Sequence, residues 1–155
     1  MLLATARTRL QQQHDDALVV RPGSIEGVWV PPDEESRVTI RRDGSGRFFG
    51  HISWLKDTSR AGQLDFRNPR RELRDRKLLG LPILVDFRED AGRRGRAKSL
   101  ESGKIYDPAR GWSVRGKLLL NEETDELRVE GWVGLGPLRV SRSYTWSRFK
   151  RTTKD

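Results

Sequence analysis

The sequence predicts an all-β domain, an antiparallel up-and-down barrel of about eight strands with one short surface helix. Apolar and polar residues alternate in runs along most of the chain, which is typical of strands with one buried and one wet face. Short turns link these runs in sequence order. Closing such a meander into a barrel removes its two exposed edges. A β-sandwich is the competing architecture.

Length and composition fit one folded domain. The chain has 155 residues, of which 34% are hydrophobic and 34% charged, so a buried core is expected beneath a strongly polar surface. Its lack of cysteine excludes disulfides, zinc–cysteine sites and a thiol nucleophile. No apolar run is long enough for a transmembrane helix. We divide the chain into an N-terminal extension (1–23), a single barrel domain (24–150) and a basic tail (151–155).

Four strands are predicted in the first half of the domain. The first carries Ile25, Gly27 and Trp29 on one face and ends at Pro31-Pro32. Val38 and Ile40 mark the second strand, the Arg42–Gly46 turn leads into the third strand (Phe48 to Leu55), and the fourth runs from Leu81 to Phe87. Between the third and fourth strands, Asn68-Pro69 followed by RRELRDRK predicts an N-cap and one or two turns of surface helix.

A central hairpin and two further strands are predicted in the second half. Asp107-Pro108 opens the hairpin turn and Gly111 closes it, and the alternating strand Trp112 to Leu120 follows. Leu127 to Val133 and Leu138 to Arg148 complete the barrel. Residues 89–98 are expected to form a polar hairpin tip. Trp132 and Tyr106 fall on outward positions, but a β-bulge would return either to the core.

Polar residues on the inner faces are the candidate ligand-binding residues. Arg142 and Tyr144 lie between Val140 and Trp146 on the inner face of the last strand. Asp107 falls in register with Ile105, and Trp54 lies on the inner face of the third strand. A buried charge requires a partner, so Arg142 pairs with Asp107 or a carbonyl, or Arg142 and Tyr144 form the polar end of an apolar pocket and bind the carboxylate or phosphate head group of a ligand.

Glycines on the inner faces leave a related choice open. Gly50, Gly103, Gly116 and Gly131 all fall on inward positions. Each could bend its strand, make room for a tryptophan or leave space for a ligand.

The chain resembles a family of unknown function, domain of unknown function 2147 (DUF2147), from Gly27 to Arg148. The resemblance is carried by GVW, GHISWLK, NPRRELRDRKLLGLPIL, GKIYDPARG, ELRVEGWVG and TWSR in that order. It implies a small lipocalin-like barrel of the calycin type, found in exported or periplasmic bacterial proteins. Two features depart from what the resemblance implies: the segment MLLATARTRLQQQHDD does not have the pattern expected of a signal peptide, and the cysteine pair of many members is missing. Lipocalin-like barrels close with a Gly-x-Trp motif whose tryptophan is covered by an arginine near the end of the chain, which implies this role for Gly27, Trp29 and Arg148.

These observations predict a non-enzymatic domain that binds a small apolar or amphipathic ligand, or an envelope partner, with no cofactor. Only two histidines are present, and no metal site, catalytic triad or nucleotide-binding loop can be assembled.

The alternative is that a basic surface binds nucleic acid or another polyanion, since the net charge is +9. Residues 66–98 contain eleven basic and five acidic residues, and the candidate contacts are Arg70, Arg71, Arg74, Arg93 and Arg94. The interspersed acids and the inward positions of most aromatics argue against nucleic acid.

Overall fold

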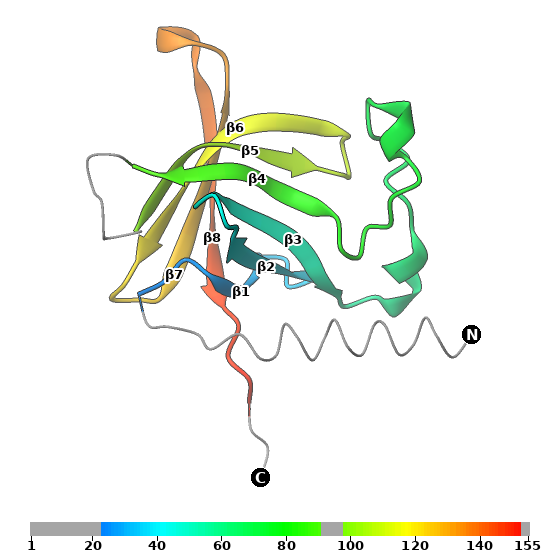
Figure 1. Ribbon diagram of the computed structural model, residues 1–155, viewed down its shortest axis with the longest axis horizontal. Coiled ribbons are helices and arrows are strands. Elements are labelled where there is room, and N and C mark those ends of the chain that lie inside the picture. Colours follow the sequence, from blue (N-terminus) through cyan, green and yellow to red (C-terminus); the bar gives the residue numbers. More distant parts are fainter. Residues whose placement is uncertain (1–22, 91–97, 153–155) are drawn as a thin grey trace.

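The computed structural model describes residues 23–90 and 98–152 and shows a closed antiparallel barrel in which the eight strands follow sequence order (Figure 1). The strands are β1 (Gly27–Val30), β2 (Ser36–Arg42), β3 (Phe48–Leu55), β4 (Pro82–Glu89), β5 (Ser99–Asp107), β6 (Trp112–Asn121), β7 (Glu126–Val133) and β8 (Val140–Arg148). The predicted fold class is confirmed, since β1 pairs with β8 and closes the sheet. The hairpin tip expected at 89–98 lies mostly outside the described residues.

One predicted element is wrong. Where a surface helix is expected after Asn68-Pro69, the chain forms only a 3-10 turn, η2 (Arg71–Leu73). Asn68 is not the N-cap of this turn, since Arg70 holds that position without a side-chain cap, but the Asn68 side-chain oxygen accepts a hydrogen bond from the Arg70 backbone at 2.9 Å. The turn contributes no buried residue, so an α-helix would have gained no apolar contact there. The other described helical turns, η1 (Thr58–Gly62) and η4 (Gly136–Leu138), are also 3-10. None of the described helices could cross a membrane.

Two apolar clusters hold the described structure together. The larger fills the barrel and contains Ile25, Trp29, Val38, Ile40, Phe48, Leu84, Phe87, Leu100, Leu118, Leu120, Leu127, Val129 and Trp146. The smaller contains Ile52, Leu55, Leu78, Leu81 and Tyr106. It anchors the excursion (residues 56–81), the long connection between β3 and β4, against the barrel.

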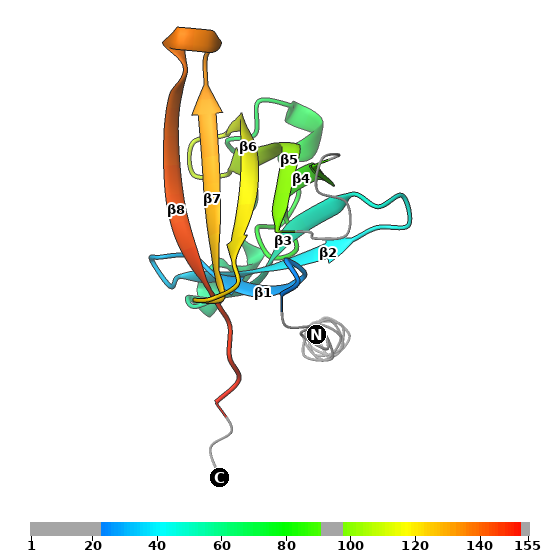
Figure 2. The same ribbon diagram turned by 90° about the vertical axis from the view of Figure 1, so that its left-hand side faces the viewer.

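The strands differ in how far they reach. β1 pairs with β8 through only Trp29↔Arg148 and Val30↔Ser147, whereas β7 and β8 pair from Glu126↔Ser147 to Val133↔Val140. The β7–β8 hairpin therefore rises beyond the rest of the barrel, with η4 at its end, while the described end of the chain after β8 leaves from the opposite side (Figures 1 and 2). This overhang leaves part of β8 without a neighbour on its other edge among the described residues.

Candidate functional site

Part of the inner face of β8 extends beyond the barrel core and is exposed to solvent. Tyr144 pairs with the buried Val129, and Arg142 pairs with Gly131, so both side chains lie on the inner face by register. Because β1 stops short, nothing described covers them, and Tyr144 is 53% exposed. We call Arg142 and Tyr144 the β8 patch. It is an accessible amphipathic surface beside the core, rather than the buried polar end of a pocket that the sequence suggests.

Arg142 has no polar partner among the described residues. It forms no salt bridge or side-chain hydrogen bond with any residue in 23–90 or 98–152. The expected pairing with Asp107 is wrong, because Asp107 closes the β5–β6 turn. Its carboxylate accepts a hydrogen bond from the Ala109 backbone at 2.9 Å and lies 3.1 Å from the Arg110 guanidinium. Since Arg142 is exposed, water can solvate its charge and no protein partner is required.

Trp54 does not lie on the inner face, in contrast to the prediction. Regular pairing matches Val38 with Ile52, but Arg37 then pairs with Trp54, because a bulge adds one residue to β3. The extra residue reverses the alternation, so Trp54 turns outward and the buried Leu55 turns inward. The Arg37 guanidinium stacks 4.3 Å from the centre of the Trp54 ring.

The inward glycines make room for neighbouring side chains. A Cβ on Gly103 would lie 2.3 Å from the Phe87 ring, and one on Gly116 would lie 2.4 Å from the Ile105 side chain. Leu84 and Val114 approach Gly50 and Gly131 in the same way. Packing therefore explains all four positions, although the neighbours are not the tryptophans that the sequence suggests. Gly103, Gly116 and Gly131 form a row across β5, β6 and β7 that ends at Arg142.

Gly27, Trp29 and Arg148 meet where the barrel closes. The buried Arg148 guanidinium lies 4.1 Å from the centre of the Trp29 ring. Its Nε donates to the Asp125 carboxylate at 2.8 Å. Its terminal nitrogens donate to the carbonyls of Glu26 at 3.1 Å and Ser24 at 2.7 Å. Every polar group of Arg148 thus has a partner within the protein, which gives these residues a structural role.

A buried polar network, which the sequence did not reveal, fixes the excursion to β5. The Tyr106 hydroxyl donates to Asp65 at 2.6 Å, and the Asn68 amide donates to the other Asp65 oxygen at 2.8 Å. Burial and the hydrogen bond to Asp65 raise the pKa of Tyr106 to about 12. Asp65 stands between the third predicted strand and Asn68-Pro69, where no periodicity marks a buried residue. The sequence pattern of β5 does not decide whether Tyr106 is exposed or buried. In the structure it is buried.

The arginines considered for a polyanion site are partly engaged within the excursion. Arg70 pairs with Glu72 at 2.9 Å, and Arg74 donates to the Asn68 carbonyl at 2.7 Å. Arg71 lies exposed, while Arg93 and Arg94 lie outside the described residues.

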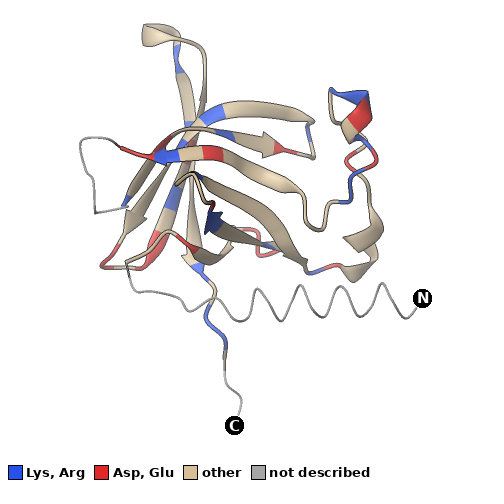
Figure 3. Cartoon of the chain, in the orientation of Figure 1, with Lys and Arg blue, Asp and Glu red and all other residues tan. Residues whose placement is uncertain are grey.

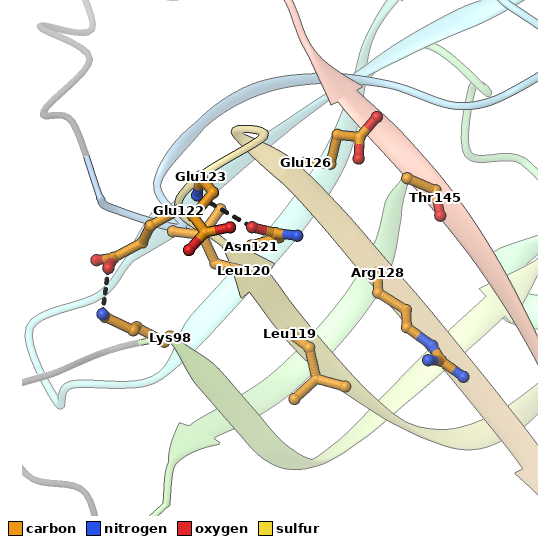
Figure 4. Close-up of a pocket in the computed structure, with 9 residues that line it drawn as sticks. All are labelled: Lys98, Leu119, Leu120, Asn121, Glu122, Glu123, Glu126, Arg128 and Thr145. Atoms are coloured by element: carbon orange, nitrogen blue, oxygen red, sulfur yellow. Dashed lines mark hydrogen bonds and ion pairs between the residues drawn. The ribbon is translucent and has the colours of Figure 1, made fainter.

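Two grooves lie on the outer surface. The first, of about 580 Å³, borders the β6–β7 turn (Figure 4). Its polar groups are largely committed to the fold, since Lys98 pairs with Glu122 and the Asn121 side chain accepts a hydrogen bond from the Glu123 backbone at 3.0 Å. The second, of about 460 Å³, is lined by residues of β5 and β6 that include Lys104, Arg115, Lys117 and the acidic Glu101, together with Trp132 and Arg139.

Comparison with known proteins now gives the chain its family. The model of the family described as "Uncharacterized protein conserved in bacteria (DUF2147)" matches residues 27–148. The chain belongs to this family. This DUF2147 protein is also similar in structure to protein HP1028 from the human pathogen Helicobacter pylori, described as a member of the lipocalin family. The TM-score is 0.68 at 21% sequence identity, over 82% of this chain and 84% of HP1028. No curated protein matches the chain. The shared feature is the lipocalin-like barrel fold.

Proposed function

We propose that this DUF2147 protein binds a small amphipathic ligand that carries an anionic head group, at the β8 patch. The observation that carries the proposal is the unpaired Arg142 on the inner face of a strand whose neighbouring positions continue the apolar core. A guanidinium recognises a carboxylate or phosphate through paired N–H donors. The ring of Tyr144 offers an apolar surface next to it for a hydrocarbon chain.

The packing of the barrel supports a site at the edge of the core rather than deep inside it. Phe87, Ile105 and Val114 already occupy the space over the inward glycines near Arg142. A ligand would therefore lie along the exposed inner face of β8, beside the core. The lipocalin-like fold is consistent with this use, since barrels of eight strands can hold one small ligand.

The first test combines native mass spectrometry with a fluorescent fatty acid, cis-parinaric acid. We expect wild-type protein to retain an acidic lipid from a bacterial lipid extract and to bind the probe. Arg142→Gln should weaken probe binding about tenfold, since a hydrogen bond to a charged group is lost at a partly exposed site. Tyr144→Ala should weaken it by a similar factor through lost apolar contact.

The matched control is Arg71→Gln, which removes an exposed arginine from the excursion and should leave affinity unchanged. Failure of the wild-type protein to bind either lipid or probe would overturn the proposal. So would equal affinities of the wild-type, Arg142→Gln and Tyr144→Ala proteins, which would place any binding elsewhere.

A further inference from the structure

The tip of the β7–β8 hairpin exposes leucines where a turn is normally polar. Leu135 is 73% exposed and Leu138 is 82% exposed, and Val133 and Val140 lie exposed directly beneath them. We call these four residues the apolar tip. A single exposed leucine on a protein surface needs no explanation, but four exposed apolar residues at one projecting tip make it a candidate interaction site.

The tip is held in a defined shape. The Leu138 backbone donates to the Leu135 carbonyl at 3.1 Å, and the Arg139 backbone donates to the Gly136 carbonyl at 3.2 Å. Gly134 has φ of 87°, and a Cβ there would lie 2.6 Å from the Leu138 carbonyl oxygen. The turn therefore presents both leucines on a hydrogen-bonded scaffold, well away from the barrel (Figures 1 and 2).

Cations and an aromatic ring lie immediately below the tip on the outer face. The Arg139 guanidinium stacks 3.9 Å from the centre of the Trp132 ring. In register, Lys104 faces Arg115, and Arg115 faces Trp132. These four residues, which we call the basic collar, line the groove of about 460 Å³. Figure 3 shows Lys and Arg along β6 and the overhanging hairpin.

Two cations of the basic collar are not neutralised by the described part of the chain. Like charges directly opposite each other on neighbouring strands are destabilising. Lys104 and Arg115 stand in this arrangement, and neither forms a salt bridge with a residue in the described part of the chain. Arg139 is 3.4 Å from Glu130, so the fold partly neutralises it. An external anion would relieve the repulsion between Lys104 and Arg115.

We propose that the apolar tip inserts into an anionic lipid bilayer surface while the basic collar contacts lipid phosphates. The order of the groups matches the order of a membrane boundary. Leucine belongs in the acyl region, tryptophan at the interface and Lys or Arg at the phosphates. A protein groove would also accept leucines, but unpaired cations beside a narrow apolar tip complement an anionic surface better. This proposal uses residues other than the β8 patch.

The test is flotation with lipid vesicles made of roughly three parts phosphatidylcholine to one part phosphatidylglycerol. The wild-type protein should bind these vesicles, bind pure phosphatidylcholine far less, and lose binding as salt rises from about 0.05 M to about 0.5 M. Leu135→Ser with Leu138→Ser should reduce binding at least about tenfold with no change of net charge. Phe66→Ser, at an exposed phenylalanine of the excursion, is the matched control and should bind normally.

The collar is tested separately. Lys104→Gln with Arg115→Gln should reduce binding to anionic vesicles about thirtyfold, since each basic residue near the surface contributes about 1 kcal/mol and about 1.4 kcal/mol is a factor of ten. Arg71→Gln with Lys150→Gln removes the same charge from exposed positions outside the tip and the collar, and should have a much smaller effect. Brominated lipids should quench tryptophan fluorescence of the unmutated protein, which gives a readout that no mutation can confound.

Three results would overturn the proposal. They are no binding of wild-type protein to either vesicle, equal binding by the leucine double variant, and a stable dimer that needs Leu135 and Leu138 but ignores vesicles. The last result would assign the tip to a second copy of the chain. Binding of cis-parinaric acid by the leucine double variant separates failure here from failure of the ligand proposal, since Arg142 and Tyr144 are untouched.

Discussion

Arg148 connects several segments at the point where the barrel closes. It binds the Asp125 carboxylate and two carbonyls and covers Trp29 with its guanidinium plane. Lysine would keep the positive charge. Its ammonium group lacks the planar fork of N–H donors with which arginine binds all three partners and stacks on the Trp29 ring. We expect Arg148→Lys to lower the free energy of unfolding by about 3 kcal/mol, measured by urea denaturation.

A side chain at Gly27 would disturb the contacts of the Arg148 guanidinium. Its φ is 137°, and a Cβ would lie 2.7 Å from the Arg148 guanidinium, so Gly27→Ala should destabilise in the same direction. Arg128→Lys, at an exposed arginine of β7, is the control. A loss below about 1 kcal/mol for Arg148→Lys would mean that the closure contact is marginal.

Trp54 shows how far alternation predicts a strand and where it stops. The existence and order of the strands follow from period-two patterns, because a half-buried strand must alternate. A bulge adds one residue at a place that neither residue type nor spacing marks, and every later side chain changes face. Asp86 and Ser102, with φ of 62° and 61°, mark further irregularities in β4 and β5 that the sequence did not reveal.

The excursion is attached to the barrel by the smaller apolar cluster and by the buried phenol of Tyr106. Since folding raises the pKa of Tyr106 to about 12 from its usual 10, folding favours the neutral phenol. The stabilisation is therefore fully present below pH 10 and is lost as pH rises toward 12. Over this window the free energy of unfolding should fall by roughly 1.4 kcal/mol per pH unit.

Urea denaturation of wild-type protein and Tyr106→Phe measures this effect. The difference in unfolding free energy between them should shrink by about 2 kcal/mol between about pH 9 and pH 11.5. Tyr144→Phe removes the other tyrosine, which is exposed, and should behave as wild type. A difference between wild type and Tyr106→Phe that stays constant with pH would show that the phenol titrates normally.

At the scale of the whole molecule, the barrel closes by a short seam. The sequence predicts closure because an open sheet would expose two edges, and Pro31-Pro32 predicts a short first strand. It could not predict how much of β8 this strand leaves uncovered, because register between strands far apart in sequence depends on tertiary packing. The uncovered length exposes the β8 patch, and the hairpin beyond it displays the apolar tip. Both proposed sites thus follow from the same mismatch in strand length.

This mismatch predicts an uneven pattern of amide hydrogen exchange. In residues 140–145 of β8, alternate N–H groups point away from β7 and have no strand partner among the described residues. In β6, Gly116, Leu118 and Leu119 pair with both neighbouring strands, while a bulge in β5 lies opposite Lys117. By mass spectrometry, about half of the amides in 140–145 should exchange rapidly, while those of 116–119 remain protected until global unfolding. Equal protection of both segments would mean that another part of the chain or a second copy covers the free edge of β8.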